Sequence, residues 1–369
     1  MELTHLPLYV GTSEPASIPG ERSQGSSAGS DLSAEEIVVA YHERTKHHYG
    51  RFAASVGYMD WATQPDPFRR YDGAQLVRLP LKSGRELSYW QLYVTNSVEA
   101  APISIDSISV FFRYALSLTA WKRFHETTWS LRANPSSGNL HPTEGYALLP
   151  AVDAVFDRPS VYHYAPKEHG LERRAEVPLS VWTALMAAFP EGSFLVGLSS
   201  VHWREAWKYG ERAFRYCQHD VGHALGTMRF AAAALGWSLC LLDRVNDSTL
   251  SRVLGLDRDT DFASAERERP ELLALVTPST WTGPRGLQLP EEAVRQVTTT
   301  TWCGRANALS PDHGVEWPLI DEVALATSSA GIPIDEDFSK CPSEEELFEQ
   351  PIRSGAFSAE RRSWDAGAL

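Results

Sequence analysis

The chain has 369 residues, 43% of them hydrophobic and 11% aromatic, so it can bury a sizeable core in one large domain or two average ones. Its formal net charge is −13, from 34 basic and 47 acidic side chains. A nucleic-acid or anionic-membrane binder needs a strongly basic face, so this charge argues against both kinds of partner.

The N-terminal part of the chain predicts a disordered leader. The segment MELTHLPLYVGTSEP has neither a basic region nor a continuous apolar one, so it predicts no secretory signal, and its acidic character argues against a mitochondrial presequence. Residues 11–33 are rich in Ser, Gly and Pro and carry almost no large apolar side chain. We therefore expect residues 1–33 to be disordered.

Two helices, separated by an irregular region, are expected next. Asp31 or Ser33 caps the first helix, over residues 34–49. Residues 53–100 include the aromatic, proline-interrupted run DWATQPDPFRRYDG and predict irregular structure. The second helix is expected over residues 104–121, SIDSISVFFRYALSLTAW.

Short β-rich runs and helices then alternate. Strands are predicted at 145–149, 160–164, 193–200, 237–242 and 271–276, and helices at 179–189 and 247–255. The strongest periodicity lies between Arg204 and Leu235, where proline is absent and apolar side chains repeat every three, four or seven residues. This pattern predicts one long buried helix that ends at Gly236.

The mixture of elements predicts the fold class and the domains. Helices and strands are mixed without regular βαβ alternation, so the expected class is α+β. One domain should span residues 34–280. Residues 281–369 are polar and acidic, with one short helix, and are expected to form a C-terminal extension or linker.

Several kinds of site lack their motifs. The four cysteines, Cys217, Cys240, Cys303 and Cys341, show no CxxC or CxxH spacing, so neither a zinc site nor a disulfide framework is predicted. A GxGxxG or a GxxxxGK[ST] sequence is missing, which argues against Rossmann and P-loop nucleotide sites. The longest apolar runs, such as FAAAALGWSLCLL, are too short to span a bilayer. We expect a cytoplasmic protein without a metal.

A loop dense in hydrogen-bonding groups precedes the strand predicted at 145–149. In SLRANPSSGNLHPTEGY, Pro135 fixes a φ angle and Gly138 permits a turn that exposes consecutive backbone groups. Asn139 can donate and accept at the edge of a heterocycle such as flavin, and Arg132 supplies a fixed cation. The alternative is an ordinary Ser/Asn-rich β-turn.

A cluster of basic side chains lies at the C-terminal end of the first predicted helix. In YHERTKHHYGRF, Arg44 and Lys46 lie beside the hydroxyl of Thr45, an arrangement that suits a phosphate. The alternative is that these cations complement the dipole at the helix C-terminus.

The start of the long predicted helix, WKYGERAFRYCQHDVGHALG, carries a second set of candidates. Lys208 beside Tyr209 could act as a general base and its hydrogen-bonding partner if burial changed the lysine pKa. Arg212 and Arg215 share a helix stripe with Lys208. The alternative is a solvated helix face with a Glu211–Arg215 pair.

A pair of histidines and a pair of glycines in this helix are not predicted to bind a metal or a ligand. His219 and His223 lack an acidic third ligand, so we predict no metal there. Gly222 and Gly226 favour close helix packing.

Together these motifs resemble the FMN-dependent nitroreductase superfamily, above all its branch of SagB-type azoline dehydrogenases, which oxidise thiazoline and oxazoline rings in ribosomal peptide natural products. The resemblance covers residues 35–278. It is carried by LRANPSSGNLHPTEGY and WKYGERAFRYCQHDVGHALG, and more weakly by YHERTKHH.

The resemblance implies roles for individual residues. Arg44, Thr45 and Lys46 would meet the FMN phosphate, and Arg132, Arg212 and Arg215 would be cofactor-binding. The isoalloxazine would be lined by Pro135, Ser136, Ser137, Gly138 and Asn139. Lys208 and Tyr209 would be the catalytic pair, and backbone groups near residues 241–243 would approach flavin N5. The resemblance also implies a homodimer, a small-molecule or peptide-derived substrate and, for a reduction, NAD(P)H as donor.

Two departures leave a second function open. The leader and the residues after 280 are not part of the single-domain pattern, although DHGVEWPLIDEVALAT is similar to the linker before a second copy in tandem relatives. The resemblance thus implies that residues 281–369 are a partly helical linker or the remnant of a second copy. The alternative to an oxidoreductase is therefore a catalytically inactive flavin-fold scaffold or partner subunit.

Overall fold

The protein is described from a computed structural model that covers residues 32–93, 97–152, 156–278 and 287–331. The predicted leader lies outside these residues up to position 31, and so does the extension from position 332.

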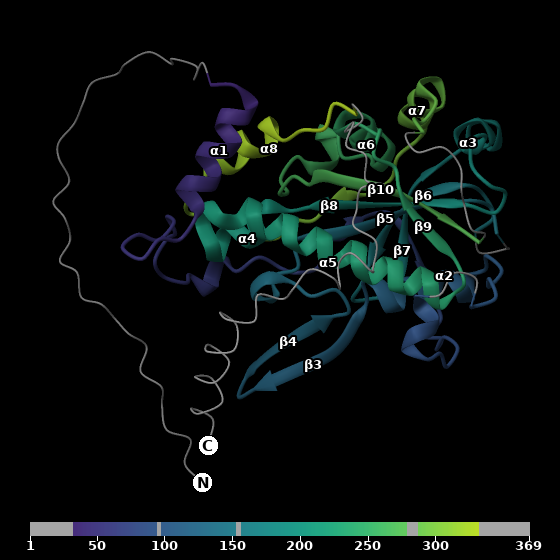
Figure 1. The fold of residues 1–369 in the computed structure, drawn as a ribbon, viewed down its shortest axis with the longest axis horizontal. Helices are drawn as coiled ribbons and strands as arrows, with labels where there is room; N and C mark the ends of the chain where they lie inside the picture. Colours follow the sequence, from purple (N-terminus) through teal and green to yellow (C-terminus); the bar gives the residue numbers. More distant parts are fainter. Residues whose placement is uncertain (1–31, 94–96, 153–155, 279–286, 332–369) are drawn as a thin grey trace, which may run out of the picture.

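A seven-stranded antiparallel sheet forms the centre of the molecule (Figure 1). Its strand order is β2-β7-β6-β5-β8-β10-β9. The strands are β2 Gln75–Arg78, β7 Gly170–Glu176, β6 Ser160–Ala165, β5 Thr143–Leu149, β8 Phe194–Ser200, β10 Arg269–Thr277 and β9 Ser238–Leu241. The strands predicted around 145, 160, 193, 237 and 271 are confirmed, as is the α+β class.

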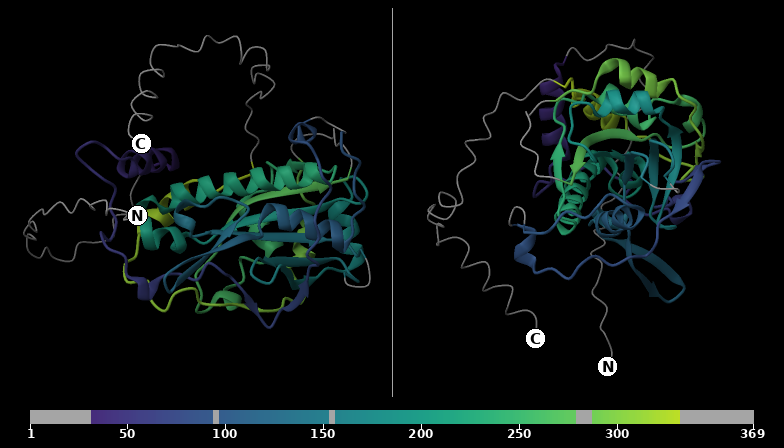
Figure 2. Two further views of the ribbon diagram at one scale, coloured as in Figure 1. Left: turned by 90° about the horizontal axis from the view of Figure 1, so that it is seen from below. Right: turned by 90° about the vertical axis from the view of Figure 1, so that its right-hand side faces the viewer.

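Helices cover both faces of the sheet (Figure 2). One face packs against α2 (Ile105–Ala115) and α5 (Ala213–Ala234). The other packs against α3 (Leu179–Met186), α6 (Asp247–Leu254) and α7 (Glu291–Thr298). Because strand side chains alternate between faces, Ala147 and Leu149 of β5 join the first core, and Tyr146 and Leu148 join the second.

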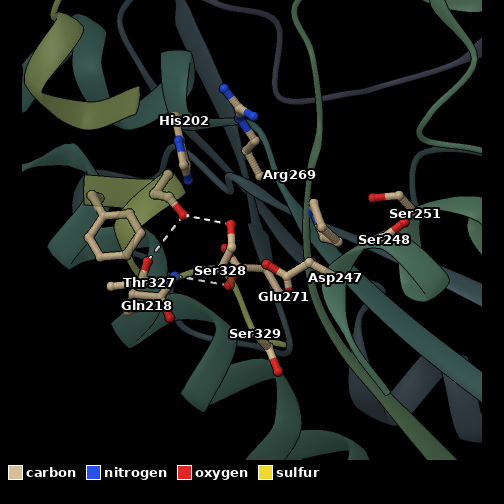
Figure 3. A pocket seen from close by; sticks show the side chains of 13 residues that line it. His202, Gln218, Asp247, Ser248, Ser251, Arg269, Glu271, Thr327, Ser328 and Ser329 are labelled. Carbon is tan, nitrogen blue, oxygen red and sulfur yellow. Dashed lines mark hydrogen bonds between the residues drawn. The ribbon is translucent and has the colours of Figure 1, made fainter. Parts of the chain in front are cut away.

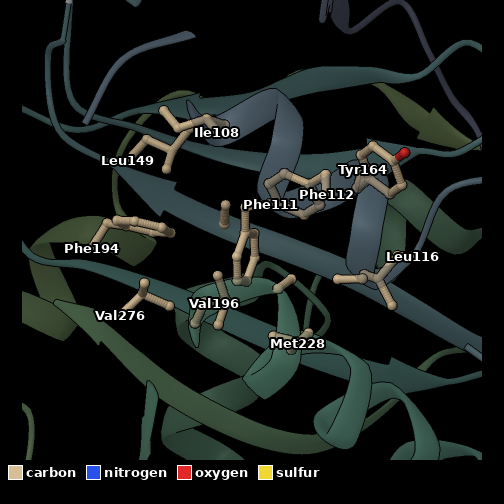
Figure 4. Packing of buried hydrophobic residues seen from close by; sticks show 14 of the residues in the cluster. Ile108, Phe111, Phe112, Leu116, Leu149, Tyr164, Phe194, Val196, Met228 and Val276 are labelled. Atoms are coloured by element: carbon tan, nitrogen blue, oxygen red, sulfur yellow. The ribbon is translucent and has the colours of Figure 1, made fainter. Parts of the chain in front are cut away.

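The first core is rich in aromatic side chains (Figure 4). Phe111 of α2 is fully buried and makes edge-to-face contacts with Phe112 and Phe194, while Phe112 stacks on Tyr164 at a ring-centroid distance of 4.6 Å. These contacts fix α2 on the sheet, and α2 leads directly into the hairpin that carries the polar loop.

The helix predicted over residues 104–121 is too long. It ends at Ala115, and Leu118–Phe124 (β3) instead pairs with Thr127–Arg132 (β4) in a separate hairpin that projects from the body (Figure 1). The chain leaves the helix where Ser117 donates its hydroxyl to the carbonyl of Arg113, and the hairpin turns at His125, which has a φ of 51°. The hairpin ends at the polar loop.

The first helix, α1, covers Ala34–Thr45 and ends before the predicted residue 49. Ser33 and Glu36 form its capping box, and Lys46 is extended, with a φ of −71° and a ψ of 129°. The region 53–100 is mostly irregular, as expected, but β2 joins the edge of the sheet and Tyr71–Asp72 (β1) pairs with Arg305–Ala306 (β11).

The long helix predicted from Arg204 to Leu235 is broken in two. Helix α4 covers His202–Tyr209, a 3₁₀ turn follows, and α5 begins at Ala213. The break is at Gly210, whose φ of 53° and ψ of −130° suit only glycine. It is held by a hydrogen bond of 3.1 Å from the Glu211 N–H to the Ala54 carbonyl.

Replacing Gly210 by Ala should lower the free energy of unfolding by about 1–3 kcal/mol, because an L-residue is strained at this φ. A Cβ would also collide with the Ala54 carbonyl oxygen and lie 2.8 Å from Ser55 Cα. Urea denaturation measures the effect. The control is Gly50→Ala, whose Cβ would meet nothing within 4 Å. Equal stability of the two variants would contradict the strain.

Residues 287–331 pack on the body. Val294 and Val297 of α7 are fully buried in the second core, and α8 (Pro318–Ala326) lies beside α1 (Figure 1). This segment holds two helices rather than the one short helix expected. In the described ranges, none of the helices combines the length and the apolar character that crossing a bilayer requires.

Candidate functional site

The turn at Gly138 touches the end of helix α4. Gly138, Asn139 and His141 have φ values of 60°, 61° and 52°, in the left-handed region. A Cβ at position 138 would lie 2.6 Å from Tyr209 Oη and 3.0 Å from Lys208 Nζ. Glycine is therefore required by both the backbone and the close approach, and the loop and the Lys208–Tyr209 pair meet.

Asp220 of α5 anchors this loop. Its carboxylate accepts hydrogen bonds from Ser136 Oγ at 2.7 Å, from the Ser137 N–H at 3.0 Å and from Ser137 Oγ at 3.1 Å. Asp220 is fully buried, and burial raises its pKa although the hydrogen bonds from Ser136 and Ser137 oppose that rise. The two serines therefore position the turn, with their hydroxyls directed to α5.

The side chain of Asn139 is satisfied within the loop. Its Nδ2 donates to the Ser130 carbonyl at 2.9 Å, and its Oδ1 lies 3.0 Å from His141 Nε2. Burial, followed by the charge of Arg132, lowers the pKa of His141 to about 2, so the imidazole is neutral. The outer surface of the loop is presented by Pro135 and Gly138, which are both exposed.

Arg132 lies beneath the loop, where its side chain is buried. Its guanidinium donates to the carbonyls of Thr143 and Pro67, and burial lowers its pKa to about 10. It therefore supports the loop from the core side.

The two basic segments come together around Thr45. Arg212 donates to the Thr45 carbonyl, and Arg215 donates to Thr45 Oγ1 at 3.1 Å. Arg44 pairs with Glu211, and this ion pair replaces the expected Glu211–Arg215 pair. The nearby Nε of Arg215 has no hydrogen-bond partner within the described ranges.

The remaining basic residues lie at the rim of this cluster. Lys46 pairs with Glu43 at 3.0 Å and keeps 44% of its side chain exposed. Partial desolvation and then the charges of Arg212 and Arg215 lower the pKa of His47, as expected in a positive field.

Two tyrosines connect the loop to the basic cluster. The rings of Tyr209 and Tyr216 lie 4.4 Å apart between centroids, and Arg212 Nε donates to Tyr216 Oη at 3.1 Å. A continuous path of contacts therefore runs from Gly138 through these rings to Thr45. The candidate site consists of this path and the side chains beside it.

The sequence did not single out two residues of this site. Asp220 shares the buried stripe of α5 with Cys217 and Ala224, and a carboxylate at such a position indicates a specific partner. Glu205, one turn before Lys208 and Tyr209, is fully buried. Asp220 lies within the segment WKYGERAFRYCQHDVGHALG, and Glu205 lies two residues before it.

Apart from this candidate site, a polar pocket lies between α5, α6 and the end of α8 (Figure 3). Its volume is about 460 Å³, and its lining includes His202, Gln218, Asp247 and Glu271. Gln218 donates to Glu271 at 2.9 Å, and burial raises the pKa of Glu271 to about 7. In the described part of the chain, groups of three or more His, Cys, Asp or Glu side chains that could hold a metal are absent.

The arrangement of sheet and helices is that of the nitroreductase fold. Residues 99–265 match the model of the nitroreductase family. The match includes the loop, Lys208–Tyr209 and Asp220, whereas Arg44, Thr45 and Lys46 precede it.

Three known proteins illustrate the similarity. A Methanocaldococcus jannaschii protein, whose assignment as a nitroreductase is itself provisional, is 23% identical over 159 residues, which are 42% of this chain and 76% of the relative. A solved structure from Anabaena variabilis, also provisionally a nitroreductase, is 26% identical with a TM-score of 0.50, covering 65% of this chain and 46% of that protein. The chain thus spans less than half of the Anabaena protein.

The third is a chain of the E. coli microcin synthetase McbBCD complex with truncated pro-MccB17 bound. It is 18% identical, with a TM-score of 0.38, over 57% of this chain and 79% of the other. A similarity this low says nothing about the substrate.

Proposed function

We propose that the protein is an FMN-dependent oxidoreductase. The observation that supports this best is the contact between the Gly138 turn and the Lys208–Tyr209 pair, continued by two tyrosines to a basic cluster. A phosphorylated aromatic ligand needs a backbone-rich edge for its ring and cations for its phosphate, and this path offers both.

The residues fit FMN in chemistry. Backbone groups of residues 135–139 would meet the ring, because the side chains of Ser136, Ser137 and Asn139 are used to hold the turn. Arg212, Arg215, Thr45 and Lys46 would hold the phosphate, with the unpartnered Nε of Arg215 as a free donor. Arg44 would contribute by neutralising the charge of Glu211 beside this cluster.

Bound FMN would supply the N5 centre that accepts or donates a hydride. The chain would supply the proton chemistry. Burial raises the pKa of Tyr209 to about 12, so its phenol keeps its proton at neutral pH and can donate a hydrogen bond. Lys208, whose Nζ lies 5.3 Å from the Tyr209 ring centroid, is then the group that accepts or returns the proton of the substrate.

The finer assignment is a SagB-type dehydrogenase. We propose an azoline-like ring, small or peptide-derived, as the substrate, with NAD(P)H as donor if the reaction runs as a reduction. We also propose a cytoplasmic homodimer that packs along α5, where a Cβ on Gly222 or Gly226 would meet nothing within 4 Å in one protomer. Backbone groups of residues 241–243 remain proposed partners of N5.

A catalytically inactive scaffold is the second candidate. It is favoured by the pairing of Arg44 with Glu211 and by the internal hydrogen bonds of Asn139, since both satisfy polar groups without a ligand.

Reconstitution with FMN and riboflavin separates these functions. The oxidoreductase should become yellow and retain FMN, whereas a scaffold should stay colourless. Arg215→Gln should weaken FMN binding by about 10- to 100-fold, since a hydrogen bond to a charged group contributes about 1.5–3 kcal/mol. It should leave riboflavin binding unchanged, because riboflavin has no phosphate.

The matched control is Arg123→Gln on the exposed β3–β4 hairpin. It should bind both flavins like the unmodified protein. Equal loss of FMN in both variants, or equal loss of FMN and riboflavin in Arg215→Gln, would remove Arg215 from the phosphate site.

A further inference from the structure

Glu205 is a buried carboxyl group without a hydrogen-bond partner. Its residue exposure is 0%, and neither of its oxygens is hydrogen-bonded to any described part of the protein. An isolated ionised carboxylate in such a place is unfavourable by several kcal/mol, so a group of this kind keeps its proton instead.

Five titratable or charged groups face Glu205 from the two helices around it. They are Arg204, Lys208 and Tyr209 of α4, and Cys217 and Asp220 of α5. Burial and then the charge of Asp220 raise the pKa of Glu205 well above its usual range, against the opposing charges of Lys208 and Arg204.

Two of these neighbours are already engaged. Arg204 pairs with Glu144 and donates to the His141 carbonyl at 2.7 Å. Asp220 accepts three hydrogen bonds from the loop, which favour its charged form. Of two neighbouring carboxyl groups that repel each other, the one with donors keeps the charge and the one without keeps the proton. Glu205 is therefore the protonated member.

Lys208 is the neighbour that can exchange this proton. It is three residues after Glu205 in the same helix, a spacing that places two side chains on adjacent positions of one face. Its ammonium nitrogen also reaches the Gly138 turn, where the flavin ring is proposed to bind.

We propose that Glu205 is a positioning residue that stores a proton and exchanges it with Lys208. Once Lys208 has given its ammonium proton to the substrate and is an amine, the O–H bond of Glu205 breaks and an N–H bond forms at Lys208 Nζ, giving a carboxylate and an ammonium group. In the opposite direction, the ammonium returns its proton to the carboxylate before Lys208 accepts a proton from the substrate. No electron is transferred. The catalytic use of this exchange rests on the proposed oxidoreductase function.

The exchange can be tested in the flavin-free protein by infrared titration in D₂O. Subtracting the spectrum of Glu205→Gln from that of the unmodified protein isolates the carboxyl band of Glu205. This band should show a protonated acid at neutral pH. Lys208→Met should raise the titration midpoint of the band by about one unit or more, because a neighbouring positive charge favours the carboxylate.

The matched control is Lys122→Met, which removes the same charge from the exposed hairpin. It should leave the midpoint unchanged. An ionised Glu205 at neutral pH, or the same midpoint in Lys208→Met as in the unmodified protein, would overturn the proposal.

Turnover of the FMN-loaded protein provides the second readout. Glu205→Gln should lower kcat by roughly 10- to 100-fold, less than the 10²–10⁴-fold effect of losing direct proton transfer, and should remove one limb of the pH profile. Glu205→Asp keeps an acid and should restore that limb.

Failure of FMN to bind, with the Glu205–Lys208 coupling intact, would refute the oxidoreductase function and support the exchange. Normal turnover without coupling would refute the exchange alone.

Discussion

Replacing Lys208 by Met should slow turnover by about 10²–10⁴-fold and leave the FMN content unchanged. The range is that of a positioned acid or base in proton transfer. Methionine preserves the aliphatic stem, and Lys208 is partly exposed, so the fold should tolerate the change. The rate is measured with a compound identified by screening for bleaching of the flavin absorbance, under conditions in which the chemical step limits turnover.

Lys122→Met serves again as the control of equal charge change, and its turnover should match that of the unmodified protein. Tyr209→Phe should have a smaller effect than Lys208→Met, since it removes a hydrogen-bond donor but no base. An unchanged rate in Lys208→Met would identify Lys208 as an ordinary solvated residue of α4. A loss of FMN together with activity would make it a cofactor ligand.

The elements predicted from sequence were those whose pattern is local. Helix α6 has an Asn246 cap, an amphipathic face and Gly255 in the left-handed conformation at its end, and all of these can be recognised in a window of ten residues. Strands β5 and β8 are apolar runs buried on both faces, which also form a local pattern.

Strand β7 was missed because its buried residues are charged. Its sequence is GLERRAE, in which Glu172 is almost fully buried and Arg174 completely so. Glu172 is paired with His163 at 2.9 Å and with Arg70, 102 positions earlier in the chain. Hydropathy places such residues at the surface, and the partners that allow their burial are distant in sequence.

In the candidate site too, local motifs were recognised from the sequence, whereas contacts between distant segments were not. The loop and the Lys208–Tyr209 pair were found from a motif, and the structure brings them together. The helix break at Gly210 and the pairing of Arg44 with Glu211 depend on contacts between segments more than 150 residues apart, such as Glu211 with Ala54 and Arg44. A periodic pattern carries no information about these contacts.

Glu144, directly after the loop, should be among the residues most important for stability. Its carboxylate accepts hydrogen bonds from Arg204 and, at 3.0 Å, from His163, and all three side chains are buried. Burial alone would raise the pKa of Glu144, but Arg204, then His163, lower it to about 2. Glu144→Gln leaves the buried Arg204 without its carboxylate, while His163 keeps Glu172. The variant should lower the free energy of unfolding by about 3–5 kcal/mol.

The pKa values of Glu144 and His163 also predict how the stability of the protein changes with pH. The contribution of Glu144 to the free energy of unfolding is complete above about pH 4.5, the pKa of its carboxyl in the unfolded chain. It is lost as the pH falls through about 2, the pKa in the folded protein. Burial would lower the pKa of His163, but Glu144 and Glu172 raise it to about 9. The contribution of His163 to stability is therefore complete below about pH 6.5 and is lost as the pH rises through about 9. Stability from this cluster should therefore be greatest between about pH 4.5 and 6.5, and the decline above this range should be smaller in Glu144→Gln.

A double variant tests whether the loss comes from the unpaired charge. Combining Glu144→Gln with Arg204→Met removes both members of the ion pair, and replacing a buried pair by neutral groups is often close to neutral in stability. Urea denaturation should show the double variant recovering part of the loss seen in Glu144→Gln, while Glu126→Gln at the exposed hairpin tip should match the unmodified protein. If the two losses simply add, the pair does not act as a unit, and the loop is held by Asp220 rather than by the charged core beneath it.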